Sequence, residues 1–158
     1  MKGNDKVIDY LNRALRLELS AINQFWIHEH QRAAGGLSAT AGECRAARRE
    51  AVQSADHLLA RLTFLEGTPN VHSVDTIETG ETVRSCFECE FSSARRAQLL
   101  FQEAAQYCRS VGDIPTANLF EDLMATKEGR IGGIERELRL MTQTGDENYA
   151  LLVARQDP

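Results

Sequence analysis

The sequence is poor in proline and in aromatic residues, and its basic residues are outnumbered by acidic ones; these features exclude several classes of protein. It has three prolines in 158 residues and 6% aromatic residues, a composition that favours helices over strands. The net charge of -5 argues against a general nucleic-acid binder, which needs a basic surface. No apolar run has the length of a membrane span, and charges interrupt the first 20 residues where a secretory signal would be apolar. We expect a cytoplasmic helical protein that binds neither nucleic acid nor membrane.

The chain length and the four cysteines narrow this expectation. A chain of 158 residues can bury a core but is short for two domains, so we expect one domain over residues 1–158.

The cysteines should be thiols, because the cytosol disfavours structural disulfides. Cys86 and Cys89 have Cys-x-x-Cys spacing, but no second close pair completes a four-cysteine metal site. Reduced thiols are the favoured interpretation, with a labile disulfide or an adventitious metal as alternatives.

Four long segments carry apolar residues at steps of three and four, the spacing of amphipathic helices. They cover approximately residues 5–34, 39–66, 81–111 and 113–145, and a short fifth helix is expected over 146–156. The link at 67–81 is the one long irregular segment. About 15 extended residues reach roughly 50 Å, whereas a helix of about 27 residues is roughly 40 Å long, so this link can run the length of a bundle. The pattern predicts an all-α fold of two antiparallel hairpins joined by a long crossover.

A cation interrupts the apolar face of the fourth segment. We call the row of side chains along such a face the seam of the helix. Lys127 lies on the same face as Met124 and Ile131, and Glu18 holds a central seam position in the first segment. The two should meet at mid-height in the bundle, where a buried carboxylate requires a cation beside it. We predict a core salt bridge between Glu18 and Lys127, joined by Arg130. The alternative is a metal or acid–base site, but the two Glu-x-x-His motifs of a di-iron bundle are absent.

Three stretches resemble signatures of the bacterioferritin family at the same spacing. They are the start, MKGNDKVIDYLNRALRLELSAINQFWIH, the segment FLEGTPN and the tail GDENYALL, and the resemblance extends over nearly the whole chain. It implies a ferritin-like four-helix bundle that forms two-fold dimers and a 24-subunit cage storing an iron mineral. The short fifth helix would lie near the symmetry axes of that cage.

The resemblance also implies where a di-iron ferroxidase centre would lie. The six ligand positions of the family fall on Glu18, Ala51, Ser54, Ala94, Lys127 and Arg130. Only Glu18 keeps a ligand of the family type, and the two cations would repel ferrous iron. We predict a degenerate, inactive centre with no catalytic residue and no metal bound within the subunit.

Haem in this family lies between two subunits and is held by a methionine from each. Val52 occupies that position here, and a valine side chain cannot ligate iron. Trp26, Arg45 and Arg49 also depart from the usual wall of the haem pocket, being bulkier or more charged. We therefore predict that haem is absent.

These features favour a non-catalytic cage subunit that works with a catalytic subunit, similar to the division of labour in heteropolymeric ferritins. The alternative within the enzyme class is a ferroxidase with relocated ligands on the inner surface or between subunits. Acidic residues such as Glu43 and Glu50 are separate candidates for facing the cavity and gathering iron. A third hypothesis is an interaction bundle that stops at the dimer. The sequence further predicts that His28 and His30 are surface or interface residues and that the basic run 45–49 is a solvated helix face or a dimer contact.

Overall fold

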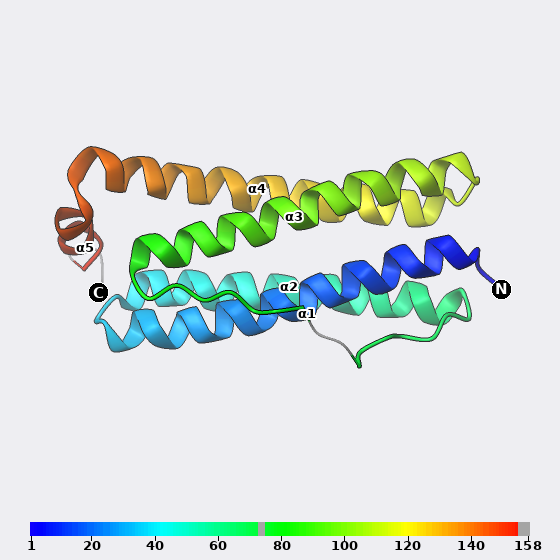
Figure 1. Ribbon diagram of the computed structural model, residues 1–158, viewed down its shortest axis with the longest axis horizontal. Helices are drawn as coiled ribbons and strands as arrows, with labels where there is room; N and C mark the ends of the chain where they lie inside the picture. The colour runs from blue at the N-terminus through cyan, green and yellow to red at the C-terminus, as the bar shows by residue number, and fades with distance from the viewer. Residues whose placement is uncertain (73–74, 155–158) are drawn as a thin grey trace.

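Four long helices lie side by side as two antiparallel pairs, and a short fifth helix lies at one end of them (Figure 1). The computed structural model describes residues 1–72 and 75–154. Its helices are α1 (Asp5–Ala34), α2 (Ser38–Phe64), α3 (Val83–Ser110), α4 (Ile114–Thr144) and α5 (Asp146–Ala154). The predicted all-α fold and helix order are confirmed. The last two residues of the predicted fifth helix, 155–156, lie outside the described residues.

Local sequence signals fix the ends of the helices. Asn4 accepts hydrogen bonds from the first free N–H groups of α1, and Asp113 does the same for α4. Thr82 and Ser85 form a reciprocal capping box at the start of α3. Gly36 and Gly112 adopt positive φ in the tight links of the two hairpins, a conformation that glycine reaches without steric cost. These signals explain why the observed bounds differ from the predicted ones by only a few residues.

The crossover after α2 returns the chain to the end of the bundle at which α2 began. As a result α3 runs parallel to α2 and antiparallel to α1 (Figure 1). The helices pack most closely within each hairpin, α1 packs on α3 between the hairpins, and α2 and α4 contact each other much less. Because α2 and α4 are not closely packed on each other, there is space between them. Within residues 1–72 and 75–154, no helix combines the length and apolar character needed to cross a membrane.

The hydrophobic core is concentrated at the end of the bundle where α1 begins and α4 begins. We call this region the apolar end; its large buried side chains include Leu11, Leu15, Leu58, Leu62, Phe101 and Phe120. The opposite end has a smaller apolar cluster beneath α5, centred on Tyr149, whose hydroxyl donates to Glu137 at 2.6 Å. The candidate site lies between these two ends.

Candidate functional site

Glu18 and Lys127 form an ion pair in the middle of the bundle. Lys127 Nζ lies 2.9 Å from Glu18 Oε1 and donates to Oε2 at 3.1 Å. The Glu18 side chain is fully buried and that of Lys127 is 11% exposed. Burial raises the pKa of the Glu18 carboxyl above its ordinary value, and the charge and hydrogen bond of Lys127 oppose that rise only in part. The lysine in the apolar seam of α4 therefore compensates a buried carboxylate on α1.

Arg130 does not join this pair, which corrects the sequence prediction. Its Nη2 lies 2.8 Å from Glu50 Oε2 on α2, and its guanidinium faces the ring of Phe25. Arg130 follows Lys127 by nearly one helical turn, so its long side chain reaches across to α2 and keeps access to solvent. Glu50, a candidate for gathering iron, is thereby held in a partly exposed ion pair.

The remaining predicted site positions are small, buried side chains. Ala51, Ser54 and Ala94 are each at most 6% exposed, and the Ser54 hydroxyl donates to the backbone carbonyl of Glu50. A cavity of about 30 Å³ adjoins Ala94 and Lys127, enough for a water molecule. Within residues 1–72 and 75–154, no group of three or more His, Cys, Asp or Glu side chains is placed to hold a metal ion.

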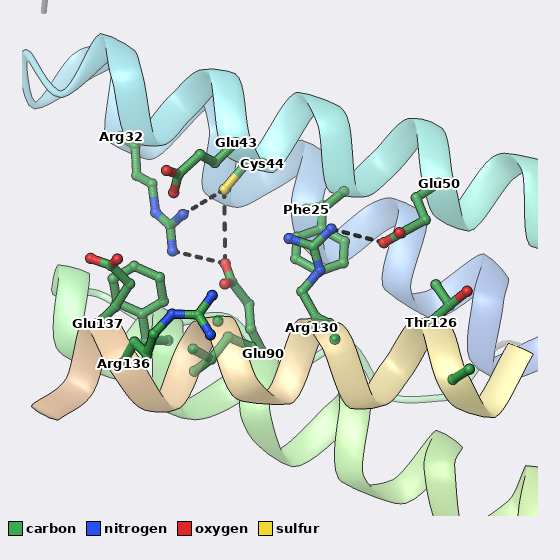
Figure 2. Close-up of a pocket in the computed structure, with 16 residues that line it drawn as sticks. Phe25, Arg32, Glu43, Cys44, Glu50, Glu90, Thr126, Arg130, Arg136 and Glu137 are labelled. Atoms are coloured by element: carbon green, nitrogen blue, oxygen red, sulfur yellow. Dashed lines mark hydrogen bonds and ion pairs between the residues drawn. The ribbon is translucent and has the colours of Figure 1, made fainter.

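A larger pocket of about 500 Å³ lies between α2 and α4 (Figure 2). Arg32 and Glu43 line it from the α1–α2 hairpin, and Arg130, Arg136 and Glu137 line it from α4. Burial raises the pKa of the Glu43 carboxyl, and the neighbouring charge of Glu137 raises it further. The pocket carries charges of both signs.

Four polar side chains from three helices form a buried cluster, which we call the polar end: His28, Arg32, Cys44 and Glu90. All of them except His28 also line this pocket. The Arg32 guanidinium donates to Glu90 Oε1 at 2.9 Å and to Cys44 Sγ at 2.8 Å. His28 Nδ1 lies 2.7 Å from the same Glu90 oxygen. Burial alone would lower the pKa of Arg32, but the charge of Glu90 raises it above its ordinary value. Burial raises the pKa of the Cys44 thiol to about 12, so this thiol is neutral at physiological pH.

The polar end was not predicted, and the assignment of His28 to the surface or an interface was wrong because its side chain is fully buried. A signal was nevertheless present. Phe25, His28 and Arg32 follow one another at steps of three and four along α1. They therefore lie on the same buried face of the helix as Glu18, farther toward its C-terminal end. His30, the other histidine predicted to lie at the surface or an interface, is exposed.

The basic run on α2 is partly neutralised within the chain. Arg45 Nε and Arg48 Nη2 lie 2.8 and 3.3 Å from the two carboxylate oxygens of Glu29, which is buried. Arg48 also lies over the ring of Trp26. On the same two helices Trp26 is 50% and Val52 is 43% exposed, so the position predicted to have lost the haem ligand faces outward.

Known proteins resemble this chain over its full length. A family model described as a ferritin-like domain matches residues 8–144. The bacterioferritin of Rhodobacter capsulatus is 40% identical over 98% of this chain and 96% of its own length, and that of Brucella melitensis is 36% identical with the same coverage. A solved structure of Rhodobacter capsulatus bacterioferritin, with a metal-free dinuclear site and haem iron in a crystallographic special position, covers 100% of this chain and 98% of its own with a TM-score of 0.96. The chain therefore belongs to the bacterioferritin family of ferritin-like proteins.

Proposed function

We propose that this protein is an iron-storage cage subunit that lacks a ferroxidase centre of its own. One observation carries the proposal. Lys127, at a position where the family pattern has a carboxylate ligand, puts an ammonium group 2.9 Å from the only remaining ligand, Glu18. A ferrous ion at that place would meet a fixed positive charge, and it would have to displace a cation that the buried carboxylate needs.

The rest of the site supports the same proposal. A di-iron centre needs carboxylates and imidazoles that converge from four helices. Ala51, Ser54 and Ala94 supply no such group, and Arg130 is engaged with Glu50. The residues present do not fit a di-iron centre.

The residues also do not fit a haem held by methionine. Val52 has only carbon atoms in its side chain, and the neighbouring surface presents the large ring of Trp26 and the Arg48 guanidinium over it. We propose that haem is absent. The absorption spectrum of the purified protein tests this directly, because bound haem gives a Soret band.

By its family, the subunit belongs in a cage of 24 copies that encloses an iron mineral in the cytoplasm. Twenty-four subunits of 17.6 kDa have a mass of about 420 kDa, which size-exclusion chromatography distinguishes from a dimer. We propose that the cage also contains a catalytic bacterioferritin subunit, since the chain's own centre cannot bind iron. Native mass spectrometry after co-expression with a catalytic bacterioferritin shows whether mixed cages form.

The decisive experiment measures oxygen-dependent oxidation of about two Fe(II) per subunit, compared with Fe(II) in matched buffer. We expect the protein alone to match the buffer rate. A variant that rebuilds the family pattern serves as the positive control: Ala51→Glu, Ser54→His, Ala94→Glu, Lys127→Glu and Arg130→His together. We expect this variant to oxidise Fe(II) faster than the wild type. A fast phase in the wild type that survives Glu18→Ala would contradict the proposal.

A second candidate function is ferroxidation at relocated ligands. It is favoured by Glu43 and Glu137, two carboxylates that line the 500 Å³ pocket and are close enough for one to raise the pKa of the other. If this pocket oxidises iron, Glu43→Gln abolishes a fast phase that Glu18→Ala leaves intact. The absence of any fast phase excludes this candidate.

A further inference from the structure

The hydrogen bonds of His28 fix which ring nitrogen carries its proton. Nε2 lies 3.2 Å from the backbone nitrogen of Gly80, and Nδ1 lies 2.7 Å from Glu90 Oε1. A backbone N–H can only donate, so Nε2 must accept through its lone pair and remain unprotonated. The proton therefore resides on Nδ1 and is donated to Glu90. Neutral His28 is the form that fits this site.

His28 thereby fastens the end of the crossover to α1. Gly80 is buried, and a Cβ atom there would meet the backbone nitrogen of Cys86 at 2.2 Å, so the chain passes too close to α3 for any other residue. Gln24, one turn before His28, donates to the backbone carbonyl of Glu78 at 2.8 Å. Two side chains of α1 thus bind consecutive parts of the same segment.

A few charged and titratable groups surround this imidazole. Arg32 of α1 shares the Glu90 carboxylate of α3 with His28. Cys44 of α2 and Cys86 of α3 are neutral thiols, since burial raises the pKa of each. The crossover contributes Glu78 through its backbone carbonyl. Beyond Arg32, the charged pocket is lined by Glu43 of α2 and by α4.

A second proton on His28 would act differently on its two hydrogen bonds. The Nδ1–H bond to the Glu90 carboxylate would become an ion pair between two charged partners and so grow stronger, which keeps the imidazolium in place. At Nε2, a new N–H would face the Gly80 N–H, and two donors cannot share one hydrogen bond. A buried backbone N–H without an acceptor is costly, so Gly80 would have to move toward water.

We propose that His28 is a proton-operated latch on the α3 end of the crossover. In the neutral form it holds Gly80, and in the protonated form it retains Glu90 and releases Gly80. Asp75 and Thr76 of the same segment line the small cavity beside Lys127, so release of the latch opens a route for water to the central ion pair. The inference does not depend on the proposed function, because it requires no iron.

Hydrogen–deuterium exchange of the assembled protein tests the latch. Protection factors, which correct for the intrinsic pH dependence of exchange, are compared at about pH 8 and about pH 5.5 for a peptide covering residues 75–86. We expect the wild type to lose about tenfold or more of its protection at the lower pH, the effect of removing one buried hydrogen bond. A peptide from α4, residues 114–124, should keep its protection.

Two variants assign the effect to His28. In His28→Gln the side-chain oxygen takes the place of Nε2 as an acceptor and does not titrate, so protection should be equal at both pH values. His30→Gln, at an exposed position on the same helix, should behave as the wild type. Equal protection of the wild type at both pH values overturns the proposal, and so does an unchanged loss in His28→Gln.

A readout on the wild type alone remains decisive if His28→Gln does not fold. Slow exchange of the imidazole C2 hydrogen, followed by mass spectrometry, reports the protonation midpoint of each histidine. The loss of protection in residues 75–86 must follow the midpoint of His28. If the loss of protection instead follows the protonation midpoint of another histidine, the proposal is wrong.

Discussion

The two ends of this bundle are built from the same helices but are held together by different forces. At the apolar end, aliphatic and aromatic side chains from all four long helices fill the interior. At the polar end, Arg32 and Glu90 are within a few percent of complete burial and depend on a few directed contacts. Hydrophobic contact tolerates small shifts, whereas a buried ion pair must keep its geometry. The comparison teaches that one end of the bundle supplies stability and the other supplies a defined arrangement of charge around a pocket.

Removing a large side chain from the apolar end should have the largest effect. Phe101 is completely buried and its ring lies 6.0 Å from that of Phe120, centroid to centroid. We expect Phe101→Ala to lower the free energy of unfolding by about 3–5 kcal/mol, because it leaves a cavity in a packed core. Chemical denaturation measures the change, and Leu99→Ala, at an exposed position on the same helix, is the control. If Phe101→Ala lowers the free energy of unfolding no more than Leu99→Ala does, the apolar end is not the main source of stability.

Lys127→Met should have a somewhat smaller effect that depends on pH. The pKa of Glu18 in the folded state is raised above its pKa in the unfolded state. As the pH rises from the unfolded-state pKa through the folded-state pKa, Glu18 loses its proton and the free energy of unfolding falls. Without Lys127 this penalty grows, and we expect a loss of about 3 kcal/mol near neutral pH that shrinks as the solution is acidified and Glu18 becomes protonated.

The double variant Glu18→Leu, Lys127→Met separates charge compensation from packing. It removes both charges, so we expect its stability to lie within about 1 kcal/mol of the wild type. Denaturation of the single and double variants across a pH series provides the test. If the loss of stability in Lys127→Met stays constant down to acidic pH, Lys127 contributes through packing and not through its charge.

Among the single substitutions at buried positions, the smallest effect should come from Arg32→Lys at the polar end. The substitution keeps the positive charge but loses the fork that contacts Glu90 and Cys44 together. We expect a loss of about 1–2 kcal/mol by chemical denaturation. Arg96→Lys, at an exposed position on α3, should leave the stability unchanged. A loss as large as that of Phe101→Ala would show that the polar end carries as much stability as the apolar end.

The sequence predicted the helices and their order because apolar periodicity and glycine-containing links are local signals. The predicted bounds of the first helix agree with α1, and the long link at 67–81 is the observed crossover apart from residues 73–74, which lie outside the described residues. The placement of Glu18 opposite Lys127 followed from their seam positions. Long side chains were harder to place, because Arg130 can reach more than one helix. The contacts of His28 depended on the path of the crossover, which no periodicity reveals.

The central ion pair has a consequence for the history of the chain. Two of the substitutions that would rebuild the family's ligand pattern are expected to be unfavourable by themselves. Ala94→Glu adds a buried carboxylate without a partner, and Lys127→Glu removes the cation that Glu18 needs and puts a second carboxylate beside it. A metal ion would compensate these charges only after most ligands had returned together. On the proposal that this chain lacks the family's centre, rebuilding it would therefore require several substitutions at once, and the Glu18–Lys127 ion pair would oppose each early step.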